Sequence, residues 1–170
     1  MIITLIGPSC CGKSYFLSAL QNQLGFIIPI GITTRPKREE DNGLLEHTSK
    51  EEFFEFKDRG KICFIAEMFG NYYTYRRTFS EKENYAIEIV RSNIEELRQI
   101  GGYAIKVLPN DIEEGLKRIK SKRNQGVEDR TQELKDEFHA IDNNIFDFVF
   151  RNNYDDESLI RFFRLIKGFK

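Results

Sequence analysis

The stretch Gly7-Pro8-Ser9-Cys10-Cys11-Gly12-Lys13-Ser14 decides the fold of this chain. It matches G-x-x-x-x-G-K-[ST], a pattern in which backbone N–H groups surround the phosphates of a nucleotide and the glycines permit the tight path. The β-branched run at residues 2–6 predicts a buried strand before the loop. Residues 13–24 carry apolar side chains at helical spacing, which predicts a helix whose positive N-terminal end faces the same phosphates.

The chemistry of this phosphate loop assigns a role to its residues. All eight are predicted to surround the phosphates of ATP. Lys13 is expected to neutralise the β and γ oxygens, and Ser14 to hold Mg²⁺. Cys10 and Cys11 fill variable positions of the pattern, and a redox role for these two thiols at a helix N-terminus is the alternative.

Outward from the loop, strands and helices alternate along nearly the whole chain. This order predicts an α/β protein of the P-loop NTPase fold, with a mainly parallel sheet flanked by helices. Ser49 is expected to cap one of the helices, with Glu52 completing a capping box. Further strands are predicted at residues 26–32, 61–68, 85–90, 103–108 and 146–150, and further helices at residues 49–60, 94–100, 111–123, 131–141 and 156–166.

Composition excludes several classes of protein. The chain has 170 residues, with 26 Lys and Arg against 27 Asp and Glu, so a net charge of −1 gives no reason to expect nucleic acid or a membrane surface as a partner. No apolar run approaches the roughly 18 residues of a membrane span, and the apolar opening lacks the basic start of a signal peptide. The three cysteines form no metal-binding spacing. We therefore expect a cytoplasmic location, without disulfides or a structural metal.

The chain resembles the guanylate kinase family over nearly its whole length. After the phosphate loop it carries T-T-R-P-K-R at residues 33–38, S-K-E-E-F at 49–53 and G-N-Y-Y at 70–73, in the order that the family has them. A basic stretch and a strand with a polar tail follow, as in the family. The resemblance implies phosphoryl transfer from ATP, with Mg²⁺, to a nucleoside monophosphate.

The resemblance also implies how the chain is divided. It implies a single domain over residues 1–170, with a core of roughly 1–31 and 80–170. A small monophosphate-binding part would cover roughly 32–79, and a lid roughly 118–132.

Roles for single residues follow from the same resemblance. Arg35 and Arg38 match the pair that grips the acceptor's phosphate, for which the planar guanidinium is well suited. Tyr73 matches a tyrosine whose hydroxyl touches that phosphate. The arginines that match the family's lid are expected to act with Lys13 in catalysis, by stabilising the transferring phosphoryl group. These are Arg118, Arg123 and Arg130.

The positions at which the family reads guanine differ in this chain. Phe64 replaces the glutamate that contacts the edge of the base, and a buried polar reader of that kind gives strong discrimination. Glu67 and Glu88 remain as further candidate acceptor-binding residues. The resemblance thus favours GMP or dGMP as the acceptor but leaves the base preference open. The other differing positions are Gly31, Leu44 or Leu45, Thr74 and Val90.

Two other functions stay open from the sequence. A related small-molecule kinase that acts on ribose 1,5-bisphosphate would fit Thr34-Arg35-Pro36 and His47, although Arg38 argues against it. The second open function is a non-catalytic binding module of the same shape, but such modules typically lack a working phosphate loop. The expected oligomeric state is a monomer or a homodimer.

Overall fold

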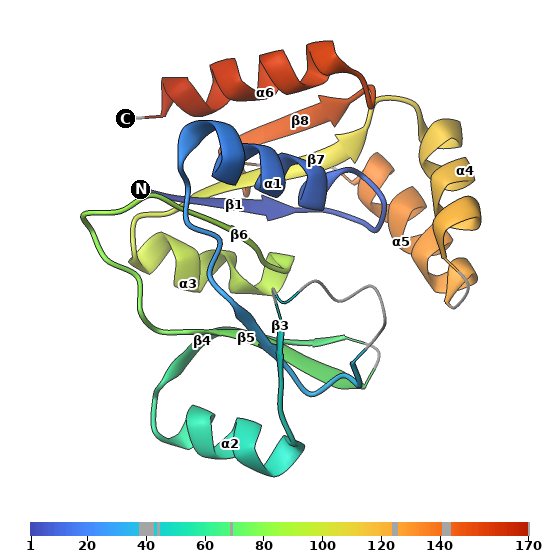
Figure 1. The fold of residues 1–170 in the computed structure, drawn as a ribbon. Helices are drawn as coiled ribbons and strands as arrows, with labels where there is room; N and C mark the ends of the chain where they lie inside the picture. The colour runs from blue at the N-terminus through green and yellow to red at the C-terminus, as the bar shows by residue number, and fades with distance from the viewer. Residues whose placement is uncertain (38–42, 44, 69, 124–125, 141–143, 170) are drawn as a thin grey trace.

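The core of the molecule is a sheet of four parallel strands in the order β6-β1-β7-β8 (Figure 1). The computed structural model describes the chain except for residues 38–42, 44, 69, 124–125, 141–143 and 170. This sheet and the helices around it confirm the predicted α/β fold. Its strands are β1 (Ile2–Ile6), β6 (Tyr85–Glu88), β7 (Tyr103–Pro109) and β8 (Phe148–Asn152).

Helices cover both faces of the core sheet, as a parallel sheet requires. Ile3 of β1 packs with Phe16 and Phe162 on one face, and Ile2 packs with Leu97 on the other. Successive side chains of β1 therefore point to opposite faces, and both faces are buried. The helices are α1 (Lys13–Leu24) and α6 (Asp156–Gly168) on the first face, and α3 (Ile94–Gln99), preceded by the short η1 (Arg91–Asn93), on the second.

A second sheet, in the order β3-β2-β5-β4, lies below the core sheet in the view of Figure 1. Helix α2 (Lys50–Asp58) packs on it through the fully buried Phe53. The predicted cap of this helix is confirmed, because Ser49 Oγ accepts the N–H of Glu52 at 3.1 Å. The assignment of residues 32–79 to a monophosphate-binding part stays a prediction. The strands are β2 (Gly31–Thr33), β3 (Leu45–His47), β4 (Ile62–Met68) and β5 (Asn71–Arg76).

Helices α4 (Ile112–Lys122) and α5 (Val127–His139) lie side by side beyond the end of β1 and β7 (Figure 1). A buried ion pair holds α5 in place: Lys106 of β7 is 1% exposed, and its Nζ lies 2.6 Å from the carboxylate of Glu137. Within the described part of the chain, no helix has the length and hydrophobicity needed to cross a membrane.

The structure corrects several predicted boundaries. The strand predicted at 26–32 is shorter than expected: β2 begins only at Gly31, after Pro29, which cannot donate to a strand ladder, and Ile27 makes an isolated bridge to Tyr85. Strands β3 and β5 were not predicted, because β3 is stabilised by pairing with β2, and β5 by pairing with β2 and β4, rather than by a long apolar run. Helix α5 begins before residue 131, at Val127, after Gly126 with a φ of +61°. Strand β8 begins two residues later than predicted.

Candidate active site

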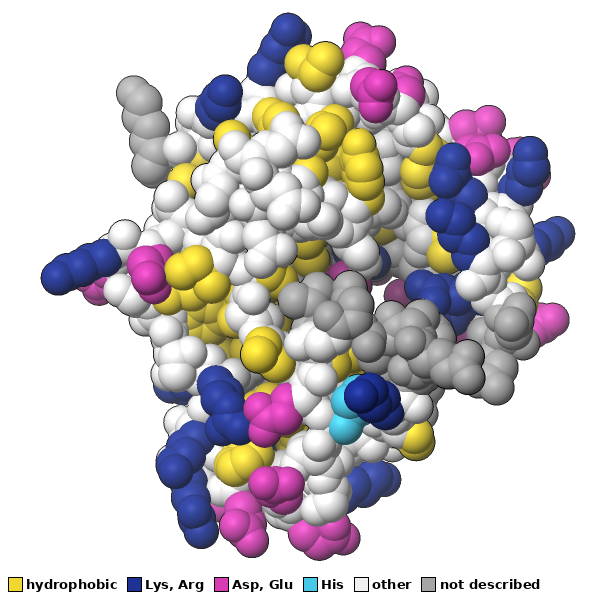
Figure 2. All heavy atoms as spheres, viewed as in Figure 1, with side chains coloured by type: hydrophobic (Ala, Val, Ile, Leu, Met, Phe, Trp, Pro, Cys, Tyr) yellow, Lys and Arg dark blue, Asp and Glu magenta, His cyan; other side chains and the backbone are white. Residues whose placement is uncertain are grey.

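A cavity of about 1590 Å³ lies between the carboxyl end of the core sheet and the second sheet. Ligands of open α/β sheets bind outside this end of the strands. On the face shown in Figure 2, Lys and Arg side chains gather over α4 and α5, beside the cavity. Of the predicted site residues, the following line it: Gly7, Ser9, Cys10, Gly12, Lys13, Ser14, Arg35, Glu67, Tyr73, Glu88, Arg118, Arg123 and Arg130.

Two of the predicted site residues that the structure describes are not among those lining the cavity. Cys11 is buried beneath the loop, and Pro8 contributes its carbonyl group to the position of Lys13. Arg38 lies outside the described residues.

The two glycines of the phosphate loop are required by close contacts. Gly7 has a φ of +149°, and a Cβ atom there would lie 2.2 Å from the carbonyl oxygen of Val107. Gly12 has a φ of +102°, and a Cβ atom there would lie 2.4 Å from Nδ2 of Asn152. Any side chain at either position would push the loop out of its path, so the loop can wrap around an anion only with these glycines.

Lys13 is held at the base of the loop. It is 8% exposed, and its Nζ donates to the carbonyl oxygens of Gly7 at 2.6 Å and Pro8 at 2.7 Å. The carboxylate of Glu88, at the end of β6, lies 3.2 Å away. Burial disfavours the charge of Lys13, but the Cys11 sulfur and Glu88 outweigh that effect, and the pKa of Lys13 lies above its ordinary value. The structure thus offers a positive charge to phosphate oxygens.

Two residues that the sequence analysis missed hold the loop from behind. Asn152, at the end of β8, donates through Nδ2 to the carbonyl oxygen of Cys11 at 2.9 Å. Tyr154 donates through its hydroxyl to the carbonyl oxygen of Cys10 at 3.1 Å. The polar residues after the last predicted strand were the one signal in the sequence that could have pointed to these contacts. The contacts themselves, with a loop more than a hundred residues away, follow only from the order of the strands in the sheet.

The three predicted lid arginines all reach the cavity from α4 and α5. Arg130 donates to the hydroxyl of Ser9 in the phosphate loop. The guanidinium of Arg118 lies 3.8 Å from the ring centre of Tyr154, and its Nε donates to Glu114 at 2.8 Å. Arg123 caps α4, and its Nε is buried without a hydrogen-bond partner in the described part of the chain. All three arginines therefore line the cavity, and Arg130 contacts the loop itself.

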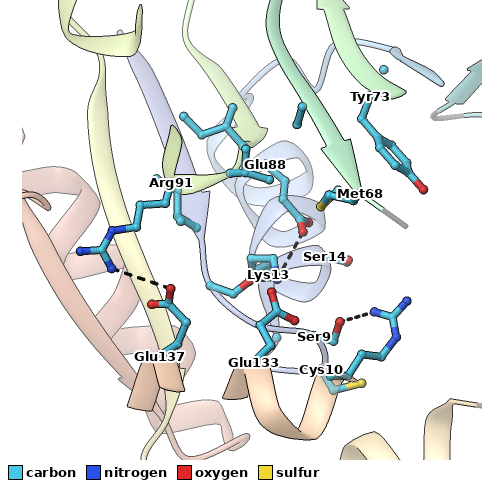
Figure 3. A pocket seen from close by; sticks show the side chains of 18 of the residues that line it. Ser9, Cys10, Lys13, Ser14, Met68, Tyr73, Glu88, Arg91, Glu133 and Glu137 are labelled. Carbon is cyan, nitrogen blue, oxygen red and sulfur yellow. Dashed lines mark hydrogen bonds and ion pairs between the residues drawn. The ribbon is translucent and has the colours of Figure 1, made fainter. Parts of the chain in front are cut away.

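Glu133 is a third residue near the loop that the sequence analysis missed. It comes from α5, and its carboxyl group points toward Lys13 between Glu88 and Ser9 (Figure 3). Burial raises the pKa of Glu133 above its ordinary value, although Lys13 and Arg130 act in the opposite direction. Two carboxylates thus face the loop lysine from opposite elements.

Arg35 marks the other side of the cavity. Its side chain is mostly buried, its Nη1 donates to the carbonyl oxygen of Pro36 at 3.0 Å, and its backbone N–H donates to the hydroxyl of Thr33 at 3.1 Å. His47 Nδ1 lies 2.7 Å from the carbonyl oxygen of Arg35, so His47 supports this turn from β3. Tyr73 of β5 also points into the cavity (Figure 3).

The wall between these two ends is mainly apolar. Four of the positions where the chain departs from the family's pattern lie on it, together with Leu45, while Leu44 is outside the described residues. Phe64 adopts a φ of +55° there and packs against Phe79. The four are Gly31, Phe64, Thr74 and Val90.

Comparison with known proteins agrees with this geometry. The family model of guanylate kinase matches residues 1–167. A guanylate kinase of Vibrio cholerae is 28% identical over 181 residues, which cover 95% of this chain and 84% of the relative. One of Clostridium acetobutylicum is 33% identical over 138 residues, covering 70% of this chain and 61% of the relative. The crystal structure of guanylate kinase from Anaplasma phagocytophilum superposes with a TM-score of 0.69 at 20% identity, covering 99% of this chain and 85% of that one.

Because its identity is low, the solved structure supports the fold alone. The family model, in contrast, extends over nearly the whole chain and includes the complete phosphate loop. The chain therefore belongs to the guanylate kinase family and is a nucleoside monophosphate kinase, a transferase.

Proposed function

We propose that this protein transfers the γ-phosphoryl group of ATP to GMP or dGMP. The observation that carries the proposal is the shared cavity, which has the phosphate loop at one side and the buried Arg35 with Tyr73 at the other. Family membership supports the coarser reaction, ATP-dependent phosphoryl transfer to a nucleoside monophosphate. The base of the acceptor is the finer assignment that needs a test.

The proposed mechanism is positioning and charge stabilisation. Lys13 would bind the β and γ oxygens of ATP after exchanging its carbonyl partners, and Arg35 and Tyr73 would orient the attacking acceptor phosphate. Arg118, Arg123 and Arg130 would stabilise the charge of the phosphoryl group in transit. Because water is the competing acceptor, the cover of α4 and α5 would also limit hydrolysis.

Magnesium fits the same end of the cavity. The hydroxyl of Ser14 is exposed there, and Glu88 supplies a carboxylate, both oxygen groups of the kind that Mg²⁺ takes. We infer that Ser14 would hold the ion, which would neutralise phosphate charge. The cytoplasmic location and the choice between monomer and homodimer stay predictions.

A coupled ADP-release assay tests the proposal. ATP and Mg²⁺ are combined with GMP, dGMP, AMP, CMP, UMP, dTMP or ribose 1,5-bisphosphate. Turnover is expected with GMP or dGMP and is expected to be lost in Lys13→Ala and Arg35→Ala. Turnover only with another acceptor would refute the guanine assignment and keep the kinase. Binding of ATP without turnover of any acceptor would favour an untested acceptor, and absence of ATP binding would favour the binding module.

A further inference from the structure

Strand β4 carries a β-bulge between Cys63 and Ala66, where it borders the cavity. Side chains from two directions hold the bulge. Thr74 donates through its hydroxyl to the carbonyl oxygen of Cys63 at 2.6 Å, and Glu96 accepts the N–H of Phe64 at 2.8 Å. Bulges beside active sites re-aim the groups of a strand, and this one turns Phe64 into the apolar core.

Asn93, the last residue of η1, makes a further contact with this bulge. Its Nδ2 donates to the carbonyl oxygen of Ile65 at 2.9 Å. Only the nitrogen of a carboxamide can donate, so this bond determines which way the group faces and leaves Oδ1 as an acceptor. That oxygen is buried and has no hydrogen-bond partner within the described part of the chain. Asn93 is 7% exposed, and it lines the cavity.

Two other polar side chains on this wall are engaged. The hydroxyl of Thr74 donates into the bulge, and the hydroxyl of Tyr75 donates to the carbonyl oxygen of Glu88 at 3.0 Å. Apolar residues such as Phe64 and Val90 lie on the same wall and suit the faces of a flat ring, while the polar residues Glu67, Tyr73 and Ser92 also line the cavity. A buried acceptor without a partner is unfavourable, and a ligand that donates to it removes that penalty.

We propose that Asn93 is a specificity-determining residue that reads the base of the acceptor. Its Oδ1 accepts a hydrogen bond from the ring N–H or the amino group on one edge of guanine. Adenine has a ring nitrogen without a hydrogen at the corresponding position, so it offers no such donor. The inference rests on the proposed function. It assigns base discrimination to η1, on the core side of the cavity, where Asn93 contacts the bulge of β4.

The test compares kcat/KM for GMP and AMP, and the affinity for GMP without ATP by calorimetry, in the full chain. Asn93→Leu removes the acceptor, and we expect the GMP-to-AMP ratio to fall about 10- to 100-fold. Asn93→Asp keeps an acceptor oxygen but cannot donate to Ile65, and we expect it to retain the preference for GMP. Asn22→Leu, the same substitution on the exposed side of α1, is the matched control. Melting temperature and ATP affinity verify that each variant is folded.

The two variants of Asn93 separate direct reading from a structural role. If Asn93→Leu keeps the wild-type ratio, the inference is overturned. It is also overturned if Asn93→Asp and Asn93→Leu lose the preference equally, since Asn93 would then act only through Ile65. If the wild-type protein neither binds nor phosphorylates any nucleoside monophosphate, the proposed function fails as well, which is a different result from an unchanged ratio.

Discussion

Replacing Asn152 by aspartate is expected to loosen the phosphate loop. Asn152 is 3% exposed and joins two segments: Nδ2 donates to the carbonyl oxygen of Cys11 at 2.9 Å, and Oδ1 accepts the N–H of Tyr154 at 2.8 Å. Aspartate keeps the second contact, because it still offers an oxygen to Tyr154. In place of the Nδ2 group, however, aspartate puts a carboxylate oxygen against the carbonyl oxygen of Cys11. Neither oxygen carries a hydrogen, so this hydrogen bond is lost.

The magnitude follows from the burial of this contact. A buried acceptor that loses its donor costs about 1–3 kcal/mol. A chain of this size changes its melting temperature by about 2–4 °C per kcal/mol, so a fall of about 2–12 °C is expected. If the free protein relaxes its loop, ATP binding must restore the loop conformation; the part of this free energy that relaxation recovers then appears as weaker ATP affinity, by up to about 150-fold, instead of as a lower melting temperature.

Thermal melting by circular dichroism and calorimetric titration with ATP measure the two effects. Asn153→Asp is the matched control, since it makes the same chemical change at the next, exposed residue. Equal melting temperatures and equal ATP affinities for the two variants would refute the reasoning, because the Asn152 carboxamide would then contribute nothing to the loop.

Three further predictions concern charge and thiol chemistry. Glu133 has a raised pKa in the folded chain, so the folded state binds its proton more tightly and loses stability as pH rises; Glu133→Gln should raise the melting temperature at pH 8 and have less effect near pH 4. Glu137→Gln should lower stability in urea unfolding by about 1–3 kcal/mol, because it removes the carboxylate charge beside the buried Lys106, whose Nζ still donates to the backbone carbonyl oxygen of residue 137 at 2.9 Å; adding Lys106→Met should recover part of the loss. Cys10 should react first with a thiol reagent, and bound ATP should slow this reaction. Cys11 and Cys63 are buried, which raises the pKa of both thiols, that of Cys63 to about 12, so they should react only after unfolding; equal reaction of all three cysteines would contradict this.

Part of the site was predictable because its residues are neighbours in sequence. The phosphate loop is one continuous stretch whose glycines, lysine and flanking strand and helix are readable from local spacing alone. The alternation of strands and helices likewise predicted the parallel sheet, whose central strands β1 and β7 are buried on both faces. The second sheet was predicted less well, since the three-residue strands β2 and β3 have too little pattern of their own and exist through pairing.

The sequence by itself therefore determined the core fold and the phosphate loop, and its resemblance to the family pointed to the arginines of the predicted lid. Only the tertiary structure decided what holds that loop and what faces the acceptor. Asn152 lies 141 residues from its partner Cys11, and Asn93 lies 28 residues from Ile65. An asparagine at either position looks like any polar surface residue in the sequence. It gains a role because strand order buries its carboxamide against a distant backbone, where each donor and acceptor needs a partner.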